Sequence, residues 1–109
     1  MIARRWTARA SDEGARAYVA FFEGVLVPQL DRIEGHRGAL VMTRSAEDGD
    51  GVDITVLTFW ASMEAISRFA GPAPDRAVVE PDARALLMDF DDRVAHEEVA
   101  VHTLRAAPR

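Results

Sequence analysis

Three stretches of the chain alternate apolar and polar side chains: residues 2–9, 52–60 and 92–103. Successive side chains of a strand point to opposite faces, so this alternation predicts half-buried strands. Residues 39–45 form a fourth candidate after a turn that runs from Gly35 through His36 and Arg37 to Gly38. The polar segment 47–51 separates residues 39–45 from residues 52–60, which predicts a β-hairpin.

Residues 12–33 change to a helical period, with a broad apolar face opposite an acidic and basic one. Ser11 or Asp12 can cap the first turn. Pro28 removes the hydrogen bond to Gly24, which predicts a bend or break near Val27.

Shorter helices are predicted between residues 60 and 92. Ser62 can cap a helix over residues 63–69, which Gly71 would end. Residues 75–79 are expected to form a further helical turn. Pro81 favours the start of another short helix, over residues 82–88.

The predicted order of elements is β, α, β, β, α, β, which is an α+β ferredoxin-like split-βαβ sandwich with an antiparallel sheet in strand order 4-1-3-2. We expect one domain over residues 1–103 and a flexible C-terminal tail over residues 104–109. Helices would cover one sheet face. The other face would carry Trp6 or Thr7 and the set Val52, Ile54 and Val56, or its neighbours, so we expect a twofold homodimer to cover it.

The amino-acid composition excludes several kinds of functional site. The 109 residues carry a formal charge of −5 and contain no Cys, Lys or Asn. This argues against nucleic acid as a partner and against thiolate metal sites, disulfides and Schiff bases. Neither a membrane span nor a secretory signal is visible, so we expect a cytoplasmic protein with no membrane partner.

His96 is the candidate catalytic residue, because a near-neutral pKa suits proton transfer and its strand is expected to pair with the first one, across from Trp6 or an adjacent residue. The alternative is a core or interface histidine. Arg4 and Arg5 project to opposite faces, so one can point inward to bind a phenolate or carboxylate. We assign Arg5 to the ligand site; the alternative is an exposed salt bridge.

Five aromatic residues can line a cleft for a flat apolar ligand, or can simply form the core: Trp6, Tyr18, Phe22, Trp60 and Phe69. No metal is expected, because His36, His96 and His102 lack the spacing of a metal site. The acidic residues of the segment 47–53 fail the calcium-loop pattern, and His36 suits a surface turn.

Several groups of residues together resemble the antibiotic biosynthesis monooxygenase family of dimeric α+β barrels. They are Met1–Arg4 with Trp6, Pro28, Gly35 and Gly38, Leu57–Ser62, Ala65, Ile66, Phe69–Gly71, and His96 with Glu98 and Val99. The resemblance implies a dimeric α/β barrel and a ligand cleft between sheet and helices. Members include cofactor-independent quinone-forming oxygenases and haem-degrading enzymes.

The haem-degrading branch uses an Asn, a Trp and an iron-ligating His, and an ungapped match puts Thr7, Phe69 and Val79 at those positions. The leading expectation is therefore a monooxygenase-like enzyme without cofactor, acting on a small aromatic or quinol-type molecule, in which His96 takes a phenolic proton. The alternatives are a non-catalytic small-ligand-binding or structural dimer and a haem binder that lacks the degrading residues.

Overall fold

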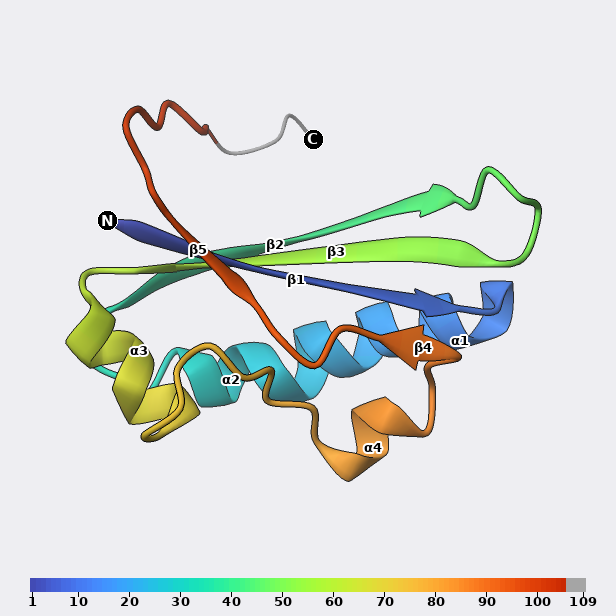
Figure 1. The fold of residues 1–109 in the computed structure, drawn as a ribbon, viewed down its shortest axis with the longest axis horizontal. Coiled ribbons are helices and arrows are strands. Elements are labelled where there is room, and N and C mark those ends of the chain that lie inside the picture. The colour runs from blue at the N-terminus through green and yellow to red at the C-terminus, as the bar shows by residue number, and fades with distance from the viewer. Residues whose placement is uncertain (106–109) are drawn as a thin grey trace.

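A computed structural model describes residues 1–105 (Figure 1). Its elements, in chain order, are β1 (Ile2–Ala10), α1 (Asp12–Phe21), the π-helix η1 (Phe22–Leu26), α2 (Val27–Leu30), β2 (His36–Ser45), β3 (Val52–Trp60), α3 (Met63–Ala70), α4 (Pro81–Arg84), β4 (Asp89–Phe90) and β5 (Ala95–Glu98). The tail predicted over residues 104–109 lies outside the described residues from 106 onward. Within residues 1–105, no helix is long and apolar enough to cross a bilayer.

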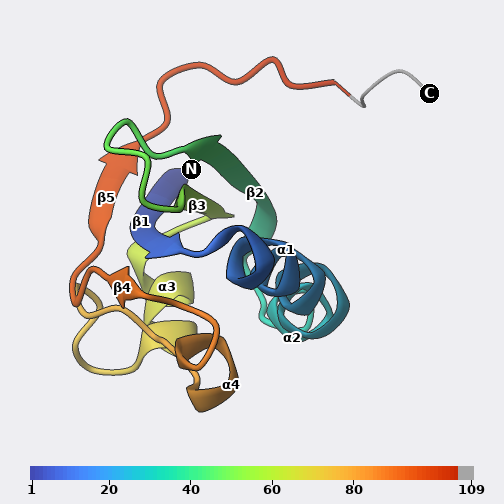
Figure 2. The same cartoon turned by 90° about the vertical axis from the view of Figure 1, so that its right-hand side faces the viewer.

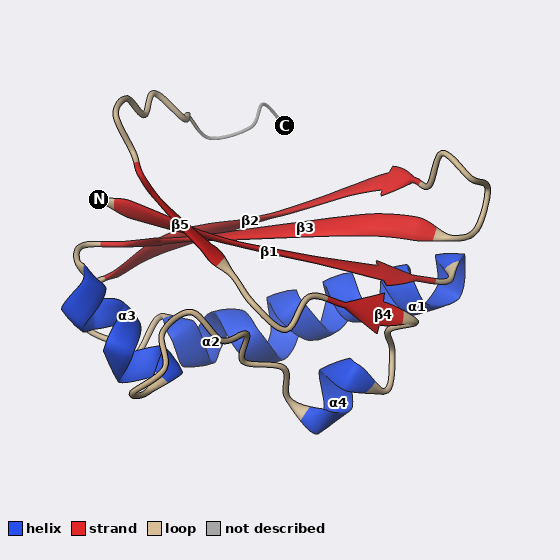
Figure 3. Ribbon diagram, in the orientation of Figure 1, coloured by secondary structure: helices blue, strands red, loops and turns tan. Residues whose placement is uncertain are grey.

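The strands form one antiparallel sheet in the order β2-β3-β1, with β4 and β5 both pairing with the outer edge of β1 (Figure 3). Ile2 pairs with Trp60 and Ala10 with Val52, so β1 and β3 match along their full length. This arrangement confirms the predicted ferredoxin-like fold and the predicted strand order.

The helices lie on one side of the sheet, and the segment that follows β5 leaves on the other side (Figure 2). Ile54, Val56 and Trp60 of β3 are buried beneath the helices. Leu57 and Phe59 alternate with them and therefore belong to the opposite, open face. The sequence left open whether Trp6 or Thr7 lies on the open face, and the structure places Thr7 there. It also places there the neighbours of Val52, Ile54 and Val56, not these three residues themselves.

The predicted helix over residues 12–33 runs through the proline without a break, but its backbone changes before the proline. Ser11 caps it by accepting the backbone N–H of Gly14 at 3.0 Å. Pro28 has no N–H for the carbonyl of Gly24. The backbone widens one turn earlier, where the N–H of Val27 bonds to the carbonyl of Phe22, and the helix then ends at Leu30 rather than Ile33.

Three further expectations from the sequence were wrong. Residues 75–79 are not helical: Asp75 lies in a turn, Arg76 forms an isolated bridge with Arg93, and residues 77–79 have no regular secondary structure. The helix after Pro81 is a single turn. The last strand, predicted over residues 92–103, is shorter: β5 covers only Ala95–Glu98. A separate short strand, β4, pairs with β1 before it, and residues 92–94 leave the edge of β1 between the two.

The turn predicted around His36 is part of β2. The strand begins at His36 and includes a bulge between His36 and Gly38, whose φ of 145° favours glycine. The imidazole is therefore not on the surface. Its side chain is 3% exposed and packs edge-on against Trp60, with ring centroids 5.0 Å apart.

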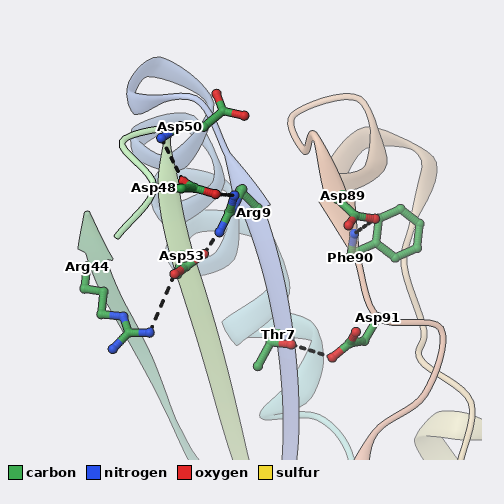
Figure 4. Close-up of polar contacts among 9 residues, drawn as sticks. All are labelled: Thr7, Arg9, Arg44, Asp48, Asp50, Asp53, Asp89, Phe90 and Asp91. Carbon is green, nitrogen blue, oxygen red and sulfur yellow. Dashed lines mark hydrogen bonds and ion pairs between the residues drawn. The ribbon is translucent and has the colours of Figure 1, made fainter. Parts of the chain in front are cut away.

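Arginines hold the acidic hairpin tip against β1 (Figure 4). Arg9 lies between two carboxylates, 2.7 Å from Asp48 and 3.1 Å from Asp53, and Arg44 approaches Asp53 at 3.7 Å. The backbone N–H of Asp50 and the Arg9 guanidinium lower the pKa of the Asp48 carboxyl. The acidic segment is thus a structural ion-pair network at one end of the sheet.

Candidate functional site

A cavity of about 270 Å³ lies between the sheet and the helices. Its floor is formed by β1 and β3, one wall by α1, η1 and α2, and the other wall by α3, α4 and the segment before α4. The lining residues are mainly apolar, and they include four of the five predicted aromatic residues: Trp6, Tyr18, Phe22 and Phe69. The alternation of β1 and β3 produces this floor, since it turns every second side chain toward the helices.

One side of the cavity is a row of tilted aromatic rings. Tyr18 lies 6.0 Å from Trp6 and 6.2 Å from Phe22, centroid to centroid. The Trp6 indole N–H donates to the carbonyl of Asp91 at 2.9 Å, which fixes the ring. Burial raises the pKa of the Tyr18 hydroxyl, so Tyr18 is a neutral phenol at the cavity wall.

On the opposite side of the cavity, two aromatic rings stack on each other and the Arg4 guanidinium lies over the second ring. Trp60 is fully buried beneath the lining and stacks on Phe69, with centroids 5.7 Å apart. The guanidinium carbon of Arg4 lies 5.7 Å from the centre of the Phe69 ring. Trp60 itself is absent from the lining residues, so its position in the core supports the wall rather than forming it.

Arg4 is the buried cation of the cavity. The residue is 4% exposed, and its guanidinium donates to the carbonyls of Pro74 and Arg76. Within residues 1–105, no carboxylate lies within 4.0 Å of the guanidinium. Burial lowers the pKa of Arg4, and the more distant Asp75 carboxylate opposes that shift. An arginine nevertheless stays protonated, so the cavity floor carries a positive charge with no carboxylate in contact, while the Glu80 carboxylate belongs to the wall.

His96 pairs with Arg4 across β1 and β5, not with Trp6. The irregular residues 92–94 between β4 and β5 set this register. The imidazole Nε2 lies 3.0 Å from Nη1 of Arg4, and Nδ1 lies 3.6 Å from the Asp75 carboxylate. Burial and the Arg4 charge lower the pKa of His96, while Asp75 raises it. His96 is not among the lining residues, so it lies behind Arg4 rather than facing the cavity.

The prediction that Arg5 faces the ligand was wrong, because Arg4 and not Arg5 points toward the helices. Arg5 points to the open face, where its side chain is 49% exposed and lies 3.3 Å from Glu97. Arg4 shares a face with Ile2, Trp6 and Ala8, all on the helix side. Trp6 and Arg4 are two residues apart in a strand, so their side chains point to the same face. Placing Trp6 on the buried face would therefore have identified Arg4 as the inward-pointing arginine.

Three further polar residues line the cavity, and no pattern in the sequence pointed to them: Gln29, Thr58 and Glu80. The Thr58 hydroxyl accepts the Trp60 indole N–H at 2.8 Å, which leaves its own hydrogen free to donate. Thr58 pairs with Arg4 across β1 and β3, so the two polar groups lie together on the cavity floor. Gln29 and Glu80 come from a helix and a loop that carry no recognisable motif.

The lining does not fit haem. None of the lining residues is a histidine, and the buried Tyr18 phenol is held in its protonated form. Haem iron needs an imidazole, thiolate, thioether or phenolate ligand. In the described part of the chain, no group of three or more His, Asp or Glu side chains is arranged to hold a metal ion.

The sequence matches no protein-family model. Nor does any curated protein match it. Solved structures do resemble it. One is a monooxygenase from the gene ActVA-Orf6 of Streptomyces coelicolor in complex with the ligand nanaomycin D, with a TM-score of 0.66, 15% identity, and coverage of 96% of this chain and 92% of that one.

Two other similar structures are candidate antibiotic biosynthesis monooxygenases. The one from Bacillus cereus has a TM-score of 0.62 and 17% identity, with 98% of each chain covered. The one from Chloroflexus aurantiacus has a TM-score of 0.56 and 21% identity, with 94% of this chain and 96% of that chain covered. The chain therefore has the fold of the antibiotic biosynthesis monooxygenases over nearly its whole length.

Proposed function

We propose that the cavity is the active site of a monooxygenase that uses neither metal nor flavin and acts on a small aromatic or quinol-type molecule. The observation that carries the proposal is a cavity of about 270 Å³ lined by aromatic rings, with one buried guanidinium at its floor. Aromatic walls suit a flat ring system, and a cation in apolar surroundings favours the ionised form of a phenol or enol. The shared fold with monooxygenases supports the same class of reaction.

In the proposed reaction, the ring system itself supplies the electrons. An anthrone-type ligand ionises by losing a proton, for which we assign Glu80 of the cavity lining as the acceptor. The anion, held by Arg4, reacts with dioxygen. The ring CH₂ becomes a carbonyl with one oxygen atom, and the second oxygen leaves as water, so no other reductant is needed. The protein contributes orientation and stabilisation of the oxyanion.

The role expected for His96 changes in this proposal. A general base must reach the proton that it removes. His96 lies behind Arg4, and its Nε2 is 3.0 Å from that guanidinium. We therefore assign the contact with the ligand oxygen to Arg4.

Oxygen uptake with a panel of anthrones and hydroquinones tests the proposal. A ligand that consumes oxygen only in the presence of the protein, with a carbonyl product by mass spectrometry, is the expected result. Uptake that persists at full rate in Arg4→Met would remove Arg4 from the mechanism, and no uptake with any member of the panel would contradict the enzyme assignment.

A non-catalytic small-ligand binder is the second candidate. It is favoured by one observation: the cavity-lining residues include a single carboxylate, Glu80, and no histidine. Saturable binding of the same anthrones without any oxygen uptake would select this function. The haem alternative lacks a histidine, cysteine or methionine in the lining, and a titration with haem should leave the Soret band as it is in free haem.

We also propose that the open face of the sheet is the contact surface of a homodimer. Leu40 and Met42 of β2 are 36% and 45% exposed there. Leu57 and Phe59 of β3 continue the same apolar surface. A second copy of the chain would cover it by a twofold contact, because the same patch on each subunit is then its own partner.

A further inference from the structure

We infer that His96 is a positioning residue that holds the Arg4 guanidinium for an anionic oxygen of the ligand, and that only the neutral imidazole can hold it. The inference deepens the proposed function, since it concerns the same cavity and specifies that the ligand carries a negative charge. It depends on three observations: the direction of the Arg4–His96 hydrogen bond, the lack of a contacting counter-ion, and the donors that Arg4 leaves unused.

The chemistry of arginine fixes the direction of that hydrogen bond. A guanidinium has five N–H donors and no acceptor. With Nη1 of Arg4 at 3.0 Å, Nε2 of His96 must accept through its lone pair. The ring proton then sits on Nδ1, which faces the Asp75 carboxylate at 3.6 Å. The negative charge of Asp75 near Nδ1 favours the tautomer that can hold Arg4, although 3.6 Å is longer than a hydrogen bond.

The charge of Arg4 is incompletely compensated. Its three hydrogen-bond partners are two backbone carbonyls and the neutral His96 ring. Within residues 1–105, the guanidinium has no carboxylate partner within 4.0 Å. Asp75 acts on this charge only from a distance. A buried cation with no carboxylate in contact is costly, and an anion that enters the cavity would lower this cost.

The remaining donors can reach such an anion. Nη1 donates to Pro74 and to His96, and Nη2 donates once, to Arg76. Among the described residues, two of the five N–H groups have no partner, one on Nε and one on Nη2. Free guanidinium N–H groups donate to carboxylate and phenolate oxygens. Arg4 belongs to the cavity lining, whereas His96 does not.

Protonation of His96 would break this arrangement. The imidazolium carries an N–H on both nitrogens, so Nε2 could no longer accept from Arg4 and two cations would face each other. The charged groups that face the ring are Arg4 from β1 and Asp75 from the segment before α4. The burial of His96 and the charge of Arg4 both favour the neutral ring, and Asp75 alone opposes them.

The test compares a planar carboxylate, 2-naphthoate, with its neutral amide of the same shape, 2-naphthamide. Calorimetry on the intact protein should show 2-naphthoate binding about 10- to 100-fold more tightly at neutral pH. Arg4→Met should abolish the difference between the two probes. The matched control Arg5→Met, which changes the neighbouring arginine on the open face, should keep it.

The role of His96 is tested by two substitutions and the pH profile. Gln at position 96 can offer an oxygen where Nε2 lies but does not titrate, and Leu offers no acceptor. We expect 2-naphthoate affinity to fall as the pH is lowered from about 7 to 5 in the wild type. His96→Gln should restore much of the neutral-pH affinity that His96→Leu loses, and its affinity should not change over this pH range.

These binding experiments test the anion site independently of the proposed reaction with oxygen. Equal binding of the two probes would mean that Arg4 only anchors the carbonyls of Pro74 and Arg76, which overturns the inference. Affinity for 2-naphthoate that rises on acidification would mean that the imidazolium itself receives the anion, and would overturn it as well. The binding assay needs no oxygen, so the predicted binding pattern combined with no oxygen uptake would reject the proposed reaction and leave the anion site standing.

Discussion

The guanidinium of Arg4 and the imidazole of His96 meet across two antiparallel strands, with Nη1 and Nε2 3.0 Å apart. Arg4 also donates to two backbone carbonyls and lies over the Phe69 ring. The other ring nitrogen of His96 lies 3.6 Å from the Asp75 carboxylate. Two basic residues in contact require one of them to be neutral, and the histidine is the one whose pKa is low enough for that.

Folding should therefore be less favourable in acid because of His96. In the native state its pKa is lowered from 6.5, so the unfolded chain binds the proton first as the pH falls. The free energy of unfolding should then decrease from about pH 6.5 down to the native pKa and show no further contribution from this group below it. Urea denaturation at a series of pH values measures the slope.

The control for this prediction is His96→Gln, which keeps an acceptor for Arg4 and removes the titration. Its unfolding free energy should be less dependent on pH than that of the wild type just below pH 6.5. The same slope in both proteins would show that the native and unfolded pKa of His96 are equal.

Loss of the Arg4 charge should reduce the reaction more than it reduces folding. Arg4→Met keeps an apolar stem against Phe69 but removes the charge that would stabilise an oxyanion. Removing one such donor commonly costs about 10²- to 10³-fold in turnover. We expect anthrone-dependent oxygen uptake to fall by a factor in this range, with less than about a twofold change in Arg5→Met. Equal losses in the two variants would indicate a general effect of charge or folding.

The sequence allowed the fold to be predicted because its local patterns agree with the final packing. The alternation of residues 52–60, the cap at Ser62 and the stop at Gly71 all lead to elements that the structure contains. The errors lie where the backbone departs from a regular period. Pro28 produces a π-turn, and residues 92–94 leave the edge of β1 before the last strand.

The aromatic residues of the cavity lining could be predicted from the sequence, but the polar residues and their contacts could not. Trp6, Tyr18 and Phe22 lie on faces that hydrophobic periodicity identifies. The partners of Arg4 depend on long-range register: the short strand β5 brings His96 opposite it, and an irregular segment supplies the carbonyls of Pro74 and Arg76. Such contacts between residues about 70 to 90 positions apart leave no local signal in the sequence.

Filling the cavity should block the ligand without unfolding the protein. Ala83 of α4 is 3% exposed and lines the cavity, so the three additional carbon atoms of Ala83→Leu would occupy space that is now open. We expect 2-naphthoate binding to weaken at least about tenfold and the unfolding free energy to stay equal or rise by up to about 1 kcal/mol. Calorimetry and thermal denaturation measure the two effects. Ala85→Leu, at an exposed position just beyond α4, should change neither, and unaltered binding in Ala83→Leu would place the ligand elsewhere.

The contact between Gly35 and Ala65 should be intolerant of a methyl group. Gly35 has a φ of +94°, and a Cβ there would lie 2.5 Å from the Cβ of Ala65 in α3. The left-handed backbone and the clash together should cost more than about 2 kcal/mol in Gly35→Ala. Gly24 has open space around it, so Gly24→Ala should instead stabilise its helix by about 0.5–1 kcal/mol. Chemical denaturation measures the free energy of unfolding of both variants. A small loss in Gly35→Ala would show that α3 shifts easily away from the turn before β2.

A charge in the middle of the open sheet face should separate the proposed dimer. Leu57 lies at the centre of that face, paired with Leu40 on one side and Arg5 on the other. Leu57→Arg would place a cation between two copies of the surface, and an unpaired charge in an apolar contact is strongly unfavourable. Light scattering should give a dimer for the wild type and a folded monomer for the variant. Val19→Arg, on the exposed side of α1, should remain a dimer. A monomeric wild type at micromolar concentration would leave the open face without its proposed partner.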